Sequence, residues 1–184
     1  MIITITGEPG SGKSTVGKKL AEKLGYERHY IGQICRDAAK DKGMTLAEYN
    51  EYGETHPETD LEVDDYQKKL GKEKNNFIIE GRTSWFLIPH SIKLYITVDP
   101  LVGAQRVYEE LKKENSRNED KNIDTVEELV KSQQRRMKSD NERYLKYYNK
   151  ECFNKDNFDF VIDTSNFTPD EVFEKVWEYI ESKK

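Results

Sequence analysis

One stretch near the start of the chain constrains the fold more than any other, because it fills the pattern GxxxxGK[ST] without a mismatch. A strand-like run at residues 2–6 precedes it, and an amphipathic helical pattern at residues 14–24 follows it and ends at Gly25. This context favours a phosphate-binding loop over a glycine-rich turn that matches by chance. The loop comprises Gly7, Glu8, Pro9, Gly10, Ser11, Gly12, Lys13, Ser14 and Thr15.

The chemistry of this loop predicts a triphosphate ligand. Its glycines let successive backbone N–H groups point into one concavity, and the following helix directs its positive end at the same place. Lys13 is expected to reach the β- and γ-phosphates, and the Ser14 hydroxyl to hold Mg²⁺. Thr15 adds a second hydroxyl at the helix start. We therefore expect the whole loop to bind a nucleotide.

Composition narrows the class of protein. The chain has 184 residues and a net charge of −5, with 35% Asp, Glu, Lys and Arg. This length suits a single domain, and an acidic balance argues against a nucleic-acid partner. The sequence has no run of 18 apolar residues, and we expect neither a membrane span nor a signal peptide. Cys35 and Cys152 are far apart, which suits free thiols in a cytoplasmic protein.

Strand and helix patterns alternate along the chain. Strands are expected at residues 2–6, 27–31, 76–80, 92–98 and 158–163, with helices at 33–42, 45–52, 59–74, 100–114 and 125–148 and one from 168 onward. Thr45 with Glu48 and Thr125 with Glu128 form capping-box patterns that open two of these helices. Such alternation predicts a three-layer α/β/α domain with a five-stranded parallel sheet.

Ligands of such sheets collect at the carboxyl ends of the strands. Residues 7–15, 32–36 and 80–82 follow the first, second and third expected strands, so they should surround one cleft. Two polar segments interrupt the pattern at residues 44–74 and 116–148. We expect these two segments to be the moving parts of a single domain.

The chain resembles the P-loop nucleoside monophosphate kinases, and within them the archaeal-type cytidylate kinases. The resemblance runs nearly end to end, through GEPGSGKST, IGQICRDAAKDKGMTLAEY, HPETDLEVDDYQ, IIEGR, ITVDP, RRMKSDNERY and FVIDTSNFTPDEV. It implies a P-loop NTPase domain with a monophosphate-binding insert at 44–74 and a helical lid at 116–148. It also implies transfer of a phosphoryl group from ATP, with Mg²⁺, to CMP or dCMP. We expect a monomer that takes two small-molecule substrates, with no nucleic-acid or membrane partner.

Two arginines are expected to bind the acceptor phosphate. Gly32 permits close approach of the backbone, and Arg36 follows one helical turn later. Arg82 follows a buried strand and a glycine, which places it at the carboxyl edge of the sheet. The competing interpretations are a surface arginine for Arg36 and a structural bridge to loop carbonyls for Arg82. Glu80 either orients Mg²⁺-bound water or fixes the phosphate loop.

Arg136, Asp140 and Arg143 fall at i, i+4 and i+7 and share one helix face. The resemblance implies that the two arginines stabilise the γ-phosphoryl group and that Asp140 orients them; the competing interpretation is an exposed ion-pair ladder. It also places Arg106 near the ATP base and phosphates. Arg135 can replace Arg136 if the register is off by one, and we expect Arg28 and Arg117 at the surface. The predicted catalytic set is Lys13, Arg82, Arg136, Asp140 and Arg143.

Recognition of the base departs from the family pattern. Thr83 stands where bacterial cytidylate kinases carry an aspartate, and Glu110 replaces a further arginine one turn after Arg106. In the insert, the candidate acceptors for a cytosine amine are Asp60, Asp64, Asp65 and Gln67. At least two of these are expected to form only a solvated helix face. Asp64 is our predicted substrate-binding residue.

Three other functions fit parts of the pattern. Another small P-loop kinase, acting on AMP, shikimate, gluconate or dephospho-coenzyme A, shares the loop, although Arg36 with Arg82 suits an anionic acceptor. A GTP-driven switch needs an NKxD signature, and the nearest run has Asn157 in place of its aspartate. A non-catalytic nucleotide sensor would not need the arginines of the lid.

Overall fold

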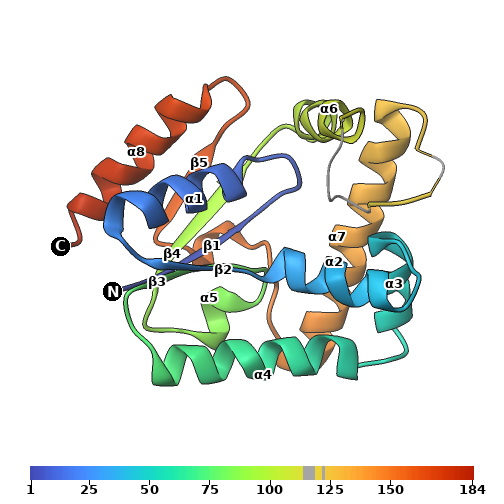
Figure 1. Ribbon diagram of the computed structural model, residues 1–184, viewed down its shortest axis with the longest axis horizontal. Helices are drawn as coiled ribbons and strands as arrows, with labels where there is room; N and C mark the ends of the chain where they lie inside the picture. The colour runs from blue at the N-terminus through green and yellow to red at the C-terminus, as the bar shows by residue number, and fades with distance from the viewer. Residues whose placement is uncertain (114–118, 122) are drawn as a thin grey trace.

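Strands and helices alternate along the chain, and the five strands form one parallel sheet (Figure 1). The computed structural model describes residues 1–113, 119–121 and 123–184. The strands are β1 (Ile2–Gly7), β2 (Glu27–Tyr30), β3 (Phe77–Glu80), β4 (Ile92–Thr97) and β5 (Phe160–Asp163), in the order β2-β3-β1-β4-β5. The predicted α/β class with a five-stranded parallel sheet is confirmed.

The helices lie close to their predicted positions. They are α1 (Lys13–Leu24), α2 (Ile31–Asp41), α3 (Leu46–Gly53), α4 (Glu58–Glu73), α5 (Ser84–Leu87), α6 (Pro100–Leu111), α7 (Val126–Tyr148) and α8 (Pro169–Glu181), with a 3₁₀ turn at Lys155–Asn157. Both predicted capping boxes form, at the starts of α3 and α7, and a third opens α8. The second helix begins at Ile31, so Gly32 lies inside it rather than before it. The prediction for Arg117 falls outside the described residues.

One face of the sheet is covered by α1 and α8 (Figure 1). Side chains of a strand alternate between the two faces, so Ile3, Ile5 and Leu94 point to the same layer. They pack with Leu20 of α1 and Val176 of α8, and all five are fully buried. This layer is the main hydrophobic core, and it holds the strand ends that carry the phosphate-binding loop.

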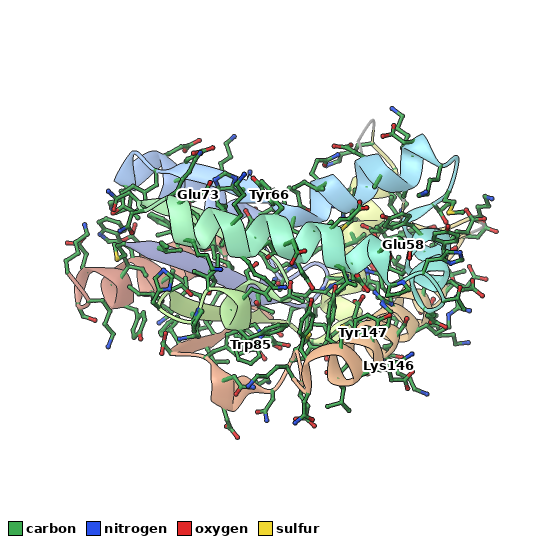
Figure 2. The ribbon with its side chains drawn as sticks, turned by 90° about the horizontal axis from the view of Figure 1, so that it is seen from below. Glu58, Tyr66, Glu73, Trp85, Lys146 and Tyr147 are labelled. Carbon is green, nitrogen blue, oxygen red and sulfur yellow. The ribbon has the colours of Figure 1, made fainter. Side chains whose placement is uncertain are left out.

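The opposite face is covered by α4 and α5. Ile2, Phe77 and Ile79 point there and pack against Leu70 of α4 and Ile88. Figure 2 shows α4 crossing this face from Glu58 to Glu73, with Trp85 of α5 and Tyr147 near the end of α7 beside it. The remaining helices, α2, α3, α6 and α7, gather beyond the carboxyl ends of the strands (Figure 1). They form the walls of a cleft at that edge.

The phosphate-binding loop packs directly against the start of α6. Gly10 has a φ of 73°, and a Cβ atom there would lie 2.1 Å from the carbonyl oxygen of Gly103. Gly12 has a φ of 84°, yet a Cβ atom there would meet nothing within 4 Å. The two glycines therefore share a left-handed backbone but differ in the space around them.

This difference predicts unequal effects on stability. Gly12→Ala should lower the free energy of unfolding by about 1–2 kcal/mol, the strain of one left-handed alanine. Gly10→Ala should lower it by several kcal/mol, because backbone of α6 must also move. Urea unfolding of the two variants provides the comparison. Equal losses would show that α6 moves away from the loop at little cost.

Candidate active site

A cleft of about 390 Å³ opens at the carboxyl ends of the strands. The phosphate-binding loop forms one side of it, and α2, α3, α4, α6 and α7 contribute the others. The predicted site residues that line it are Gly7, Pro9, Gly10, Ser11, Gly12, Lys13, Ser14, Thr15, Gly32, Arg36, Asp64, Arg82, Arg106, Arg136 and Arg143. The sequence prediction of a single cleft at this edge therefore agrees with the structure.

Glu8 has a structural part in the phosphate-binding loop. Its carboxylate accepts hydrogen bonds from the Thr97 hydroxyl at 2.6 Å and from the backbone N–H of Val98 at 2.8 Å, both at the end of β4. Its carbonyl oxygen accepts a hydrogen bond from Lys13 Nζ at 3.0 Å. The Glu8 side chain thus anchors the loop to the sheet, and a contact of Glu8 with the nucleotide stays a prediction.

Arg106 connects the loop to the segment after β5. Its guanidinium donates to the Gly10 carbonyl at 3.3 Å and to the Thr164 carbonyl at 2.8 Å. Arg106 lies on α6 and lines the cleft beside the loop. Arg106 therefore lies beside the phosphate-binding loop, and its contact with a nucleotide stays a prediction.

Arg36 and Arg136 lie on α2 and α7 and meet across the cleft at one carboxylate. Glu119 Oε1 lies 3.1 Å from Arg36 Nη2, and Glu119 Oε2 lies 3.1 Å from Arg136 Nη1. Arg36 also donates to the Tyr30 hydroxyl and to the Gly32 carbonyl, each at 3.0 Å. Neither arginine is an exposed surface residue, because Arg36 is 7% exposed and the Arg136 side chain 17%.

Burial and repulsion from Arg82 lower the pKa of Arg136 to about 10, although Glu119 and Asp140 oppose this shift. Burial also acts to lower the pKa of Arg36, but the charges of Tyr30 and Glu119 outweigh it and raise the pKa. Both arginines remain charged near neutral pH. Arg135, the alternative if the register were off by one, has a side chain that is 77% exposed. Of Arg135 and Arg136, only Arg136 lines the cleft.

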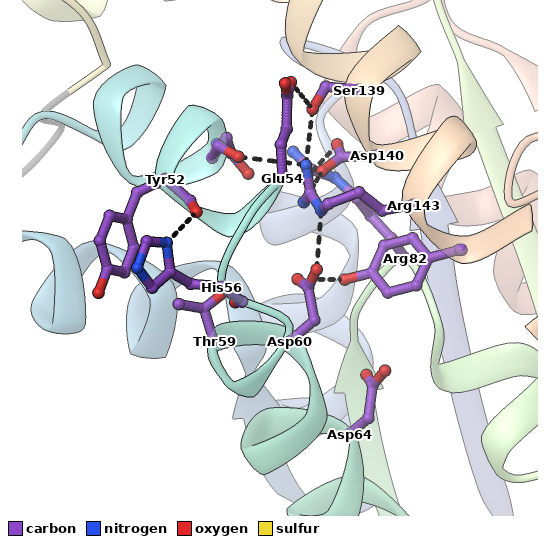
Figure 3. Close-up of polar contacts among 12 residues, drawn as sticks. Tyr52, Glu54, His56, Thr59, Asp60, Asp64, Arg82, Ser139, Asp140 and Arg143 are labelled. Atoms are coloured by element: carbon purple, nitrogen blue, oxygen red, sulfur yellow. Dashed lines mark hydrogen bonds and ion pairs between the residues drawn. The ribbon is translucent and has the colours of Figure 1, made fainter. Parts of the chain in front are cut away.

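Arg143 joins α7 to the insert through a buried network (Figure 3). Its Nε lies 2.7 Å from Asp60 Oδ2 on α4, and its Nη2 lies 2.9 Å from Asp140 Oδ1. Its Nη1 donates to the Ser139 hydroxyl at 2.7 Å and to the Asn50 carbonyl at 3.3 Å. All three guanidinium nitrogens of Arg143 thus have protein partners. A contact of this arginine with the phosphates of the substrates, as the resemblance implies, stays a prediction.

Asp140 is fully buried and pairs with Arg82 as well as with Arg143. The resemblance implies that Asp140 orients Arg136 and Arg143. In the structure the direct partners of Asp140 are Arg82 and Arg143. Arg82 remains at the end of β3 and lines the cleft. Asp140 therefore links the end of the sheet to the long helix, and the exposed ion-pair ladder does not describe these residues.

The base candidates of the insert separate into different environments. Asp65 is exposed and pairs with Lys68, while Asp60 binds Arg143 and accepts from the Tyr144 hydroxyl at 2.8 Å. Asp64 is 1% exposed, and its Oδ1 accepts from the Thr83 hydroxyl at 2.7 Å.

Gln67 completes the polar cluster around Asp64. Its Nε2 donates to Asp64 Oδ1 at 3.1 Å and to the Thr83 hydroxyl at 3.0 Å, and its Oε1 accepts from the Ser84 hydroxyl at 2.5 Å. These bonds fix the orientation of the Gln67 amide. Asp64 Oδ2 is left buried without a hydrogen bond, although the Tyr148 hydroxyl is near enough to favour the charged carboxylate.

Glu80 at the end of β3 pairs with Arg28 on β2 at 2.5 Å. Arg28 therefore has a structural partner and is not simply the surface residue that the sequence suggests. Glu80 Oε1 also lies against Gly17 of α1, where a Cβ atom added to the glycine would be only 2.4 Å from it. Glu80 Oε2 is buried without a hydrogen bond. The carboxylate thus packs under the helix that carries Lys13 and Ser14.

The loop residues fit a bound Mg²⁺. This ion usually keeps several waters and takes only one or two protein oxygens beside substrate phosphates. The hydroxyl of Ser14 lines the cleft, and the partnerless Glu80 Oε2 is an acceptor suited to a metal-bound water. Among residues 1–113, 119–121 and 123–184, no group of three His, Cys, Asp or Glu could hold a metal by itself.

The sequence reasoning missed Glu119 and the Arg28–Glu80 pair. Glu119 lies in a polar run without periodicity, so the sequence offers no signal for its burial. Arg28 lies on an edge strand, and its partner lies 52 positions away in the sequence. Both contacts depend on how distant segments pack.

Comparison with known proteins identifies the class. The fold and the phosphate-binding loop define a P-loop kinase. Residues 2–166 match the cytidylate kinase-like family, and the chain belongs to that family. The cytidylate kinase of Archaeoglobus fulgidus is 35% identical over 185 residues, covering 100% of this chain and 97% of that protein. The cytidylate kinase of Pyrococcus furiosus is 37% identical over 174 residues, covering 94% and 84%.

Solved structures share the fold at lower identity. A protein from Eubacterium ventriosum has a TM-score of 0.68 at 21% identity, covering 99% of both chains. A shikimate kinase from Bacteroides thetaiotaomicron has a TM-score of 0.65 at 14% identity, covering 98% of both. Within the part of the chain that the structure describes, no helix has the length and apolarity to cross a membrane.

Burial raises the pKa of Asp64 to about 6, and this shift predicts a pH-dependent contribution to stability. A carboxyl group whose pKa is higher in the folded state binds its proton more tightly there, so it destabilises the fold as pH rises from about 4 to about 6. Relative to the native protein, Asp64→Asn should gain up to about 3 kcal/mol of unfolding free energy between pH 4 and pH 7.

Urea unfolding at both pH values measures this difference. Asp65→Asn is the matched control, since it makes the same replacement at an exposed carboxylate of the same helix. A pH-independent effect of Asp64→Asn would show that Asp64 ionises normally in the folded protein.

Proposed function

We propose that the protein transfers the γ-phosphoryl group of ATP to a nucleoside monophosphate, with CMP or dCMP as the preferred acceptor. The observation that carries the proposal is the convergence of Arg36, Arg82 and Arg136 on one cleft with the phosphate-binding loop. Three guanidinium groups suit a phosphate acceptor better than an uncharged sugar, because planar guanidinium groups bind phosphate oxygens in pairs. The curated relatives named as cytidylate kinases support CMP as that acceptor.

The base is assigned to the Asp64 cluster. A buried carboxylate oxygen without a hydrogen bond is costly unless a donor reaches it. The exocyclic amine of cytosine is such a donor, whereas uracil presents a carbonyl oxygen at the same position. Asp64 Oδ2 makes no hydrogen bond of good geometry, although the Tyr148 hydroxyl lies near it, and Asp64 lines the cleft together with Thr83 and Gln67. This arrangement supports cytosine over uracil.

The reaction needs positioning and countercharge rather than a general base, because the acceptor phosphate is already ionised. In the proposed mechanism Arg36 and Arg82 hold the acceptor phosphate, while Lys13 and the loop N–H groups hold the donor phosphates. Arg136, which shares the Glu119 carboxylate with Arg36, also contacts the acceptor phosphate and offsets charge on the transferring group. Mg²⁺, when bound at the Ser14 hydroxyl, neutralises charge on the β- and γ-phosphates.

Asp140 and Arg143 are proposed to act through other residues. Asp140 orients Arg82, and Arg143 fixes Asp140 while joining α7 to the insert. The proposal includes segments 44–74 and 116–148 as the parts that close over the substrates and exclude water. We also propose that the protein is a cytoplasmic monomer with no nucleic-acid or membrane partner. These expectations rest on the family resemblance and the acidic composition.

An ADP-release assay against CMP, dCMP, UMP, AMP and shikimate tests the function. We expect the highest kcat/KM with CMP or dCMP. Lys13→Ala should lower kcat by about 10³ with an unchanged fold, because it removes countercharge from the phosphates. Lys18→Ala, on the exposed face of the same helix, is the control. Turnover with shikimate alone, or a fully active Lys13→Ala protein, would contradict the proposal.

The arginines should separate by role. Arg36→Ala should raise the KM for CMP by about tenfold or more and leave the KM for ATP nearly unchanged, because it loses a charge-assisted contact to the acceptor. Arg82→Ala should also lower kcat. Arg135→Ala is the matched control, since that side chain is exposed beside Arg136. A raised KM for ATP with a normal KM for CMP would place Arg36 and Arg82 on the wrong substrate.

A further inference from the structure

The carboxylate of Glu119 lies where a phosphate would bridge Arg36 and Arg136. One oxygen pairs with each guanidinium at 3.1 Å, and the residue is 8% exposed within the wall of the cleft. Two acceptor oxygens on one planar group, each facing a guanidinium, reproduce the arrangement that arginines give to a phosphate. The cleft thus contains an anion supplied by the chain itself.

The backbone around Glu119 is held from outside the cleft. Its carbonyl oxygen accepts a hydrogen bond from the N–H of Ala47 on α3 at 2.9 Å. The next residue, Asp120, accepts from the Ser132 hydroxyl on α7 at 2.5 Å, and Lys121 Nζ lies 2.5 Å from Glu48 Oε1. These contacts fix where the Glu119 side chain starts, so its reach to both arginines is a feature of the fold.

Electrostatics explains why an anion belongs there. Burial and the charge of Arg82 disfavour the charged form of Arg136, and Arg36 adds to that repulsion. Glu119 opposes this effect and favours the charged forms of both Arg136 and Arg36. Without a carboxylate between them, two buried guanidinium groups would face each other with little compensation. The geometry therefore keeps both arginines charged and aligned before any substrate arrives.

We propose that Glu119 is a positioning residue that takes the place of the acceptor phosphate between Arg36 and Arg136, and that the monophosphate displaces it on binding. This inference rests on the proposed function. The affinity for the monophosphate then depends on how much more favourably Arg36 and Arg136 bind its phosphate than the Glu119 carboxylate. A phosphate dianion carries more charge than a carboxylate and can make the exchange, whereas an unphosphorylated nucleoside cannot. Glu119 thus selects acceptors that already carry a phosphate.

Glu119→Gln tests the exchange, with Glu142→Gln as the matched control that makes the same replacement on the exposed face of α7. Glu119→Gln should lower the KM for CMP by about three- to tenfold, because the competing anion is gone. The KM for ATP should stay within about twofold, and Glu142→Gln should leave both KM values unchanged.

Thermal unfolding gives a readout that a purely structural role would not produce. Without ligand, Glu119→Gln should have a lower Tm than the native protein, because Arg36 and Arg136 lose their countercharge. The rise in Tm on adding CMP or inorganic phosphate should be larger than in the native protein, because the ligand now supplies the missing anion. In Glu142→Gln the ligand-induced rise should equal the native one.

An unchanged or raised KM for CMP in folded Glu119→Gln, with no larger ligand-induced rise in Tm, would overturn the inference. If Arg36→Ala raises the KM for CMP as expected, that outcome refutes the role of Glu119 alone. If neither variant changes the KM for CMP, the proposed function fails as well. Should Glu119→Gln not fold, Glu119→Asp replaces it. Its shorter carboxylate cannot span both arginines, so the KM for CMP should again fall, by a smaller factor.

Discussion

Repulsion among positive charges is the constraint on which the cleft depends. Arg36, Arg82 and Arg136 come from three different elements and converge at the carboxyl edge of the sheet. Two like charges about 4 Å apart repel by about 4 kcal/mol near a protein surface. Each guanidinium therefore needs a carboxylate partner before substrate binds. Asp140 pairs with Arg82, and Glu119 is shared by Arg36 and Arg136. This compensation lets three guanidinium groups stay charged at one edge of the sheet before an anion binds.

A second consequence concerns the insert and the long helix. Arg143 contacts Asp60 on α4, the Asn50 carbonyl on α3 and Asp140 on its own helix (Figure 3). The insert and α7 are thus joined by a buried ion-pair network rather than by exposed pairs, and breaking one partner of such a network leaves an uncompensated buried charge. A movement of α7, and of Arg136 with it, should therefore carry α3 and α4 along.

Local patterns were enough to predict much of this molecule. The phosphate-binding loop, the parallel strands and both capping boxes depend on short-range spacing, and all three appear in the structure. Partners far apart in the sequence were harder to predict. Thr83 alone suggests a lost base contact, but the fold brings Asp64 from α4 to within 2.7 Å of its hydroxyl. Asp64 is among the residues of the insert that the sequence proposes for the base, but no pattern around Asp64 or Thr83 shows that the two side chains meet.

Asp140 and Glu119 illustrate two ways to compensate the same arginines. Asp140 is fully buried on α7 and pairs with both Arg82 and Arg143. Separating it from these arginines would leave the Asp140 carboxylate buried with neither a partner nor solvent. Glu119 is carried by an irregular segment, and its partners Arg36 and Arg136 line the open cleft. A substrate anion can therefore replace Glu119 but not Asp140. The first carboxylate keeps Arg82 in one orientation through the whole reaction, while the second maintains Arg36 and Arg136 only until a phosphate arrives.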